Sequence, residues 1–169
     1  MIRTLVASIC ICILFSSATS AVHAEAEVTG INIIEYGLYS VSKAEDVESS
    51  SSPSGFSTHV DNILLKTKTT DIPAVVGNQF GLRYYVKGAP EGKEAEITII
   101  VKYPPPGVKN PDTNKVYLKN TSKTPRLIGK PYFFGYQFDY PWEIVPGSWI
   151  VELWHNNKKF AEKEFKVIK

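Results

Sequence analysis

The sequence has 169 residues, of which 43% are hydrophobic, and it carries a formal net charge of +2 at pH 7. This near balance of charge argues against nucleic acid as the main partner, since nucleic-acid-binding domains present a strongly basic surface. Acidic residues cluster in 25–48 and basic residues in 109–130. Segments of one sign are typical of solvated loops; the alternative is a contact with an anionic surface of the cell envelope.

Residues 1–24 have the pattern of a secretory signal peptide. Arg3 supplies a positive start, 5–15 is a short apolar run, and Val22-His23-Ala24 fits a small-x-small cleavage site. The apolar run is shorter than the roughly 20 residues that a membrane-spanning helix needs. We therefore predict an exported, periplasmic protein (secretion is the alternative) with one domain at 25–169 and no membrane span.

The first part of the exported chain predicts strands separated by turns. Residues 27–41 and 58–70 are rich in β-branched and aromatic residues, and Gly37 predicts a bulge or a close backbone approach. Between these strands, the acidic and Ser-rich segment 43–57 cannot bury apolar surface. We predict that this segment is a mobile loop.

The clearest alternation of apolar and polar residues comes next, in 80–87 and 95–103. The Gly/Pro turn between these two runs predicts a β-hairpin. Segment 109–130 is predicted to be an irregular basic loop with one short edge strand at 116–118.

Three further strands are predicted towards the C-terminus, at 132–138, 149–154 and 160–168. The last two are joined by Asn156-Asn157, since Asn tolerates the positive φ of a tight turn. No segment has helical periodicity. Seven to nine short strands predict an all-β fold, a single antiparallel β-sandwich of immunoglobulin-like size.

Several blocks occur in an order that is typical of one known family. They are TTDIPA at 69–74, GNQFGLRY at 77–84, PPGVKNP at 105–111, WEIVPGSW at 142–149, KFAEK at 159–163 and FKV at 165–167. Over residues 69–167 the chain resembles the bacterial domain-of-unknown-function family 3859. It departs from the family at Ile144, where Leu is usual, and in 115–126. The resemblance implies a bacterial origin and no assigned activity, so no catalytic residue is transferred.

Aromatic residues near the C-terminus suggest a first candidate surface. Trp142 and Trp149 are predicted to be core residues. Trp154 is out of step with Trp149 along the strand and is predicted to face the other side of the sheet. Beside Tyr85 or Tyr140, an exposed Trp154 could stack on a sugar or a peptide.

Two carboxylates suggest a second candidate site. Asp139 and Glu143 could act as the acid and base of a glycoside hydrolase. The structural interpretation is that Glu143 caps backbone N–H groups beside the Pro-Gly turn or pairs with a base such as Arg83.

Metal binding is not predicted. His59 and Asp61 could share one strand face and His155 lies in a turn, but a stable site usually needs three or four ligands. Both cysteines, Cys10 and Cys12, lie in the predicted signal peptide, so the exported chain has no thiol ligand. We predict no metal and no cofactor.

The sequence thus favours an exported, non-catalytic binding or envelope-accessory module. Its candidate binding residues are Trp154, Tyr85, Tyr140, Arg83 and Glu143, and its partner would be an envelope protein or glycan. The alternatives are an envelope glycan hydrolase that uses Asp139 and Glu143, or a structural subunit of a larger envelope assembly. Nothing in the sequence specifies an oligomeric state.

Overall fold

The computed structural model describes residues 25–50 and 52–169, without the side chains of residues 43–46 and 58–61. The predicted signal peptide at 1–24 lies outside this described part. The described residues form eleven β-strands and one short 3-10 helix, η1 (Pro141–Glu143). None of the helical structure described is long and apolar enough to cross a membrane. The all-β prediction is confirmed.

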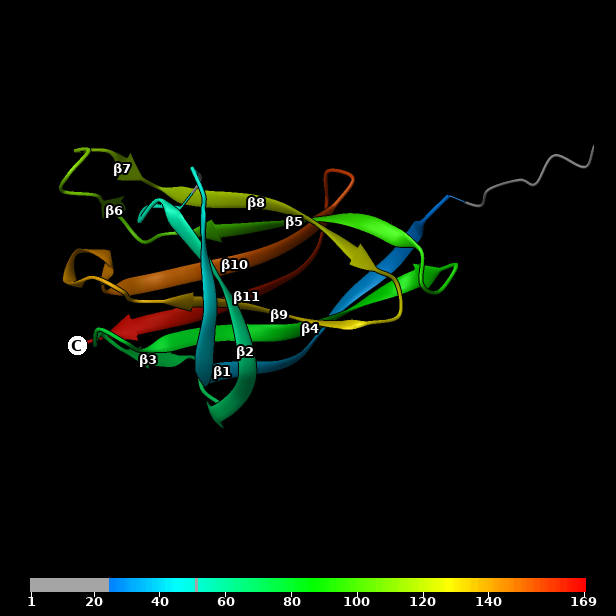
Figure 1. Ribbon diagram of the computed structural model, residues 1–169, viewed down its shortest axis with the longest axis horizontal. Helices are drawn as coiled ribbons and strands as arrows, with labels where there is room; N and C mark the ends of the chain where they lie inside the picture. Colours follow the sequence, from blue (N-terminus) through cyan, green and yellow to red (C-terminus); the bar gives the residue numbers. More distant parts are fainter. Residues whose placement is uncertain (1–24, 51) are drawn as a thin grey trace, which may run out of the picture.

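Two sheets form the body of the molecule (Figure 1). The first has the order β2-β1-β4-β9 and the second the order β3-β11-β10-β5-β8. The first contains β1 (Glu27–Glu48), β2 (Phe56–Thr67), β4 (Gln79–Ala89) and β9 (Pro131–Gln137). The second contains β3 (Asp71–Pro73), β5 (Glu94–Lys102), β8 (Lys119–Leu127), β10 (Gly147–His155) and β11 (Lys158–Ile168). Neighbouring strands are antiparallel, except that β3 is parallel to β11.

A third pairing joins β6 (Val108–Lys109) to β7 (Val116–Tyr117). The described strands therefore outnumber the seven to nine that were predicted. The strands without a predicted counterpart are β3, β6 and β8, whereas β7 matches the short edge strand predicted at 116–118. β3 and β6 are too short to leave a periodicity in the sequence.

Alternate residues of the two sheets meet in one core. Trp149 is fully buried at its centre, and its Nε1 donates a hydrogen bond to the carbonyl oxygen of Val145 at 2.8 Å. Four rings contact it edge-on, with centroids 4.8–5.8 Å away: Phe80, Tyr103, Tyr136 and Phe138. Such edge contacts add to the stabilisation from apolar burial. The prediction that Trp149 belongs to the core is confirmed.

The predicted hairpin of 80–87 with 95–103 is wrong. Both segments are strands, but β4 belongs to the first sheet and β5 to the second. The turn at Gly92 carries the chain from one layer to the other, so the apolar faces of β4 and β5 are buried in the shared core. Period-two alternation identifies a strand with one buried face; it does not distinguish pairing in one sheet from packing between two.

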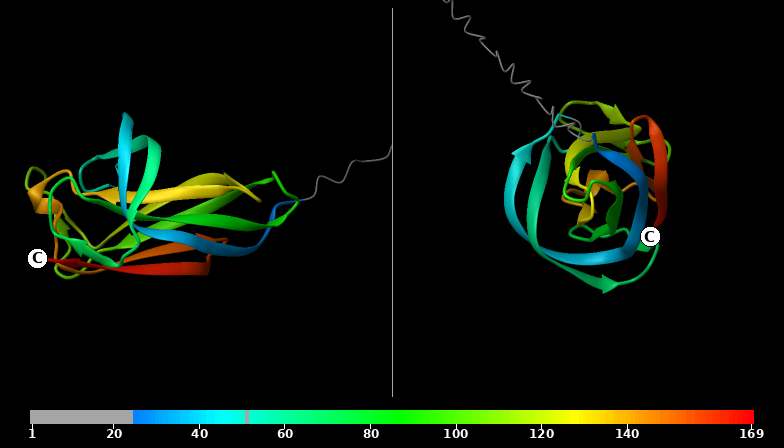
Figure 2. Two further views of the ribbon diagram at one scale, coloured as in Figure 1. Left: turned by 90° about the horizontal axis from the view of Figure 1, so that it is seen from below. Right: turned by 90° about the vertical axis from the view of Figure 1, so that its right-hand side faces the viewer.

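The expected loop at 43–57 is also wrong in its main part. Strand β1 continues to Glu48, and β2 begins at Phe56, so the two form a long hairpin whose short tip includes residues 49–50 and 52–55. We name this hairpin, residues 38–67, the arm. It runs across the other strands in Figure 1 and stands away from the body in Figure 2. Backbone pairing stabilises strands here although few side chains are apolar.

A row of three glycines lies where the arm leaves the sheet. Gly37, Gly81 and Gly135 are neighbours across β1, β4 and β9. Beyond this row the arm packs on the sheet through Tyr39, whose ring meets Phe133 edge-on at 4.8 Å. Gly37 has a φ of +147°, and a Cβ there would lie 2.0 Å from the backbone oxygen of Thr67. The close backbone approach that was predicted at Gly37 is confirmed.

The irregular basic loop expected at 109–130 contains a long strand. Strand β8 pairs with β5 over nine successive residues, from Lys119 opposite Lys102 to Leu127 opposite Glu94. β8 is an edge strand, and its lysines and Pro125 are typical of edges that are protected from further pairing. Because most of its residues are polar, β8 has no hydrophobic periodicity, and the strand was not predicted from the sequence.

Candidate functional site

A pocket of about 150 Å³ with a largely polar lining lies beneath the tip of the arm. Its walls come from the tip, from β8 and β9 at the facing edges of the two sheets, and from η1. We call it the tip pocket. Because these segments are far apart in the sequence, only the folded chain assembles it.

The arm tip covers this pocket with hydroxyl groups. Ser49, Ser52 and Ser54 line it, and Ser52 and Ser54 share a hydrogen bond between their hydroxyls at 3.0 Å. Two turns compact the tip, since the N–H of Ser52 donates to the carbonyl of Ser49 and the N–H of Gly55 to that of Ser52, both at 3.1 Å. The Ser-rich composition thus serves a folded turn.

Asn110 fastens the tip to the body. Its side chain is buried, and its Nδ2 donates to the carbonyl oxygen of Pro53 at 2.9 Å. Its Oδ1 accepts from the backbone N–H groups of Asp112 and Thr113 at 2.8 and 3.1 Å. One amide therefore links the turn between β6 and β7 to the arm, and fixes the cover of the tip pocket.

Glu143 lies at the inner wall of the pocket and is 2% exposed. Its Oε2 accepts the backbone N–H groups of Asp139 and Tyr140 at 2.7 and 3.0 Å, and its Oε1 accepts the hydroxyl of Tyr136 at 3.4 Å. Burial raises the pKa of Glu143, although the two backbone hydrogen bonds act in the opposite direction. The capping that was proposed from the sequence is present.

Two side chains beside these carboxylates act as hydrogen-bond donors: Tyr136 donates to Glu143 and Gln137 donates to Asp139. Burial raises the pKa of Tyr136 and of Tyr103, so both phenols stay protonated near neutral pH. On the rim, Nε2 of Gln137 donates to Oδ1 of Asp139 at 2.7 Å. Asp139 and Glu143, the two carboxylates considered as an acid–base pair, thus both line the tip pocket. Each accepts hydrogen bonds from neighbouring groups of the chain.

Two amide side chains that line this pocket each have an oxygen without a hydrogen-bond partner among the described residues. These oxygens are Oε1 of Gln79 and Oδ1 of Asn120, and both atoms are buried. Gln79, which is 7% exposed, begins β4 opposite Gln137, while Asn120 lies on β8. Neither residue was predicted from the sequence, since isolated amides form no motif.

The aromatic surface proposed around Trp154 is not assembled. Trp154 lies on β10 in the second sheet, whereas Tyr85 lies on β4 in the first. Tyr140 stacks instead on Trp142, with centroids 5.5 Å apart and rings 9° from parallel. Trp142 is only partly buried, at the edge of the core.

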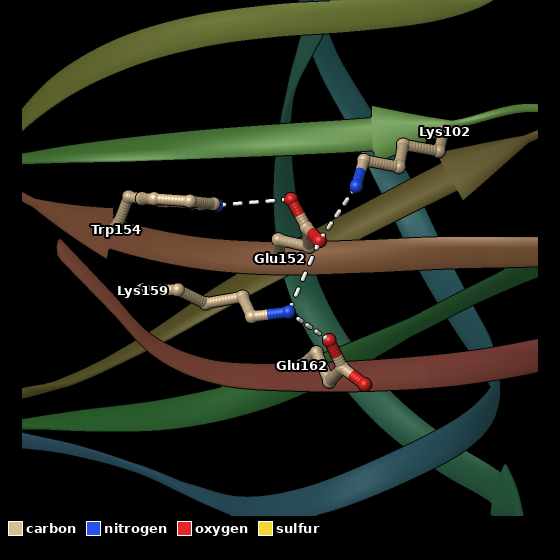
Figure 3. A network of polar contacts seen from close by, with 5 residues as sticks. All are labelled: Lys102, Glu152, Trp154, Lys159 and Glu162. Atoms are coloured by element: carbon tan, nitrogen blue, oxygen red, sulfur yellow. Dashed lines mark hydrogen bonds and ion pairs between the residues drawn. The ribbon is translucent and has the colours of Figure 1, made fainter. Parts of the chain in front are cut away.

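Trp154 belongs to a charged cluster on the outer face of the second sheet (Figure 3). Its Nε1 donates to Oε2 of Glu152 at 3.0 Å, and Lys102 and Lys159 approach Oε1 at 2.8 and 3.4 Å. Burial opposes ionisation of Glu152, but the hydrogen bonds from Lys102, Trp154 and Lys159 outweigh it and lower the pKa. The carboxylate of Glu152 is thus buried with hydrogen-bond or ion-pair partners for both of its oxygens.

Arg83 fixes the arm and does not line the tip pocket. Its Nη2 donates to the carbonyl oxygen of Ile63 at 2.6 Å, and its Nε lies 3.1 Å from Oε1 of Glu35. Tyr39 donates its hydroxyl to the same carboxylate at 3.1 Å. The proposed pairing of Arg83 with Glu143 is therefore replaced by pairing with Glu35.

The candidate metal ligands do not converge in the part of the chain that is described. The side chains of His59 and Asp61 lie outside it. Nδ1 of His155 lies 2.9 Å from the carbonyl oxygen of Glu96. No group of three or more His, Cys, Asp or Glu residues that could hold a metal ion is found among the described residues.

The model of a family named Domain of unknown function (DUF3859) matches residues 27–167. The chain belongs to this family. The match confirms the resemblance seen in 69–167 and extends it through the arm. No curated protein matches the sequence.

Solved structures resemble this DUF3859 chain in fold. An immunoglobulin-like protein from Pseudomonas aeruginosa aligns with a TM-score of 0.57 and 27% identity, covering 87% of this chain and 99% of that chain. An alkylpurine DNA glycosylase from Pseudomonas fluorescens aligns with a TM-score of 0.40 and 15% identity, over 59% of this chain and 28% of that one. The latter score is too low to carry an argument. The first comparison confirms the immunoglobulin-like β-sandwich.

Proposed function

We propose that this protein is an exported, non-catalytic module of the cell envelope that binds a small hydroxyl-rich ligand in the tip pocket. The observation that carries the proposal is the buried, unpaired Oε1 of Gln79, a residue that lines a pocket whose other polar groups are hydroxyls, amides and carboxylates. A buried polar atom without a partner is energetically costly, and a ligand that donates a hydrogen bond removes that cost. The signal-peptide pattern at 1–24 supports export.

The chemistry of the lining supports a sugar-like ligand. Phe56 and Phe134 add apolar surface to a ring of Ser, Asn and Gln side chains. Small-molecule sites combine apolar walls with a few placed polar groups in this way. The arm tip closes one side, so a ligand would be held between the arm and the body.

The bonding of Glu143 favours binding over hydrolysis. Both of its oxygens already accept hydrogen bonds, and two of the three donors are backbone N–H groups of the chain. A general acid or base must exchange its proton with a substrate atom within hydrogen-bond reach. Glu143 is better placed to shape the pocket than to turn over a substrate.

The test uses thermal unfolding of the protein expressed from its full-length coding sequence and purified. We expect glucose, N-acetylglucosamine, glucosamine or a peptidoglycan fragment to raise the melting temperature. At 100 times the Kd the stabilisation is about 2.7 kcal/mol, or roughly 5–10 °C for a chain of this size.

A matched pair of variants locates the site. Ser122 lines the pocket from β8, and Thr121 precedes it on the same strand without lining the pocket; both are exposed. Ser122→Trp should abolish the shift while Thr121→Trp preserves it. If no probe shifts the transition, or if both variants respond alike, the tip pocket is not the binding site. A stably co-purifying protein would then support the structural-subunit alternative.

A further inference from the structure

The tip pocket has an excess of hydrogen-bond acceptors and of negative charge. Its lining contains two acidic side chains, Asp139 and Glu143, and no Lys, Arg or His among the described residues. The lysines of the neighbouring strand include Lys119 and Lys123, and neither lines the pocket. A ligand that enters therefore meets a field that favours positive charge.

The unpaired atoms add a second, independent requirement. Oε1 of Gln79 and Oδ1 of Asn120 are both acceptors, and Gln79 is more than nine-tenths buried. An acceptor is satisfied only by a donor, and a protonated primary amine offers three donors and no acceptor. Hydrogen bonds in which the donor is charged are also stronger than neutral ones.

We infer that the ligand carries a protonated primary amine beside its hydroxyl groups, as an amino sugar does, and that Gln79 and Asn120 receive the ammonium group. This inference rests on the proposed function and deepens it, because it names the chemical class that the same pocket selects. The serines of the arm tip then face the hydroxyl groups of the ligand. A neutral sugar leaves the excess acceptors and the negative charge only partly compensated.

The experiment compares three probes by titration calorimetry on the purified protein from the full-length coding sequence. Glucosamine carries the ammonium, glucose has a hydroxyl in its place, and N-acetylglucosamine has a neutral amide there. We expect glucosamine to bind at least about tenfold more tightly than either of the others. Gln79→Met and Asn120→Leu, which remove the acceptors at similar volume, should reduce this preference to less than about threefold.

Thr121→Val is the matched control, since Thr121 lies on β8 next to Asn120 and does not line the pocket. It should keep the preference of the unmodified protein, and circular dichroism should show that all three variants are folded. Equal binding of the three probes, abolished by Ser122→Trp, would overturn the amine inference and leave the proposed function standing. A preference for glucosamine that survives both Gln79→Met and Asn120→Leu would also overturn it. Absence of binding by all three probes at millimolar concentration would overturn both.

Discussion

At the scale of single residues, two buried glutamates show opposite solutions to the same problem. Glu143 is held by two backbone N–H groups and one phenol, without a cation, and its pKa is raised. Glu152 is held by Lys102, Lys159 and an indole N–H, and its pKa is lowered. Neutral donors only partly compensate for lost hydration, whereas two ammonium groups more than compensate for it.

The two carboxylates should therefore affect stability with opposite dependence on pH. A raised pKa in the folded state means that ionised Glu143 destabilises the fold as pH rises above its ordinary value of 4.5. A lowered pKa means that ionised Glu152 stabilises the fold above 4.5, and that this contribution is lost as pH falls through the folded-state pKa. A tenfold difference in acid dissociation constant between the folded and unfolded chain corresponds to about 1.4 kcal/mol.

Urea unfolding of the Glu143→Gln and Glu152→Gln variants on both sides of pH 4.5 measures this difference. Relative to the unmodified protein, Glu143→Gln should gain stability as pH rises above that value. Glu152→Gln should instead lose relative stability as pH rises towards it. The same trend in both variants would contradict the assigned environments.

At the scale of elements, the arm depends on the glycine strip, the row of Gly37, Gly81 and Gly135 across β1, β4 and β9. Gly81 and Gly135 allow the backbones and the Phe133 ring to approach, and Gly37 lets β1 pass Thr67. Beyond this strip Tyr39, Arg83 and Asn110 fix the arm at successive points along its length. A two-stranded hairpin is marginally stable alone, so these contacts with the body hold it in place.

Substitution of the middle glycine should disrupt this arrangement. A Cβ on Gly81 would lie 2.1 Å from the backbone oxygen of Phe134, so the backbones must separate. Gly81→Ala should therefore lower the free energy of unfolding by about 1–3 kcal/mol or more, as overpacking does. Gly30→Ala is the control, because its nearest contact would be 3.7 Å away, on Lys87. Chemical denaturation of both variants is the measurement, and equal losses would refute the role of the glycine strip.

At the scale of the whole molecule, β8 and β9 are edge strands of different sheets, and no backbone pairing joins them. Side chains connect the two sheets at one end of these strands, where Arg126 donates to the hydroxyl of Tyr84 at 3.1 Å and Tyr132 accepts the N–H of Leu127 at 2.7 Å. The arm tip covers the other end and forms the tip pocket there. The aromatic core around Trp149 holds the two sheets together.

Loss of the central indole should therefore weaken the whole sandwich. Trp149→Ala removes a fully buried ring and should cost about 3–5 kcal/mol of unfolding free energy. Trp154→Ala, on the outer face of the same strand, should cost clearly less because its ring is partly exposed. Urea titrations followed by circular dichroism measure both variants. A larger loss for Trp154→Ala would show that the outer cluster, not the core, dominates stability.

The sequence by itself determined the strands with one buried face, the last hairpin and the family. The turn at Asn156-Asn157 formed as predicted, with φ values of +45° and +61°, because tight turns depend on local backbone preferences. Alternation in 80–87 and 149–154 correctly identified the side chains that face the core, because a strand with one buried face places apolar residues at every second position.

Only the tertiary structure decided which strands pair, where the arm lies and what lines the tip pocket. Strand β8 and the parts of β1 and β2 nearest the arm tip are polar and held by backbone hydrogen bonds, which carry no side-chain signature. Gln79, Asn120 and Glu143 come from three distant segments, and each residue alone is inconspicuous in the sequence. Their significance depends on the removal of water and the loss of hydrogen-bond partners, and these conditions exist only once the two sheets and the arm have packed together.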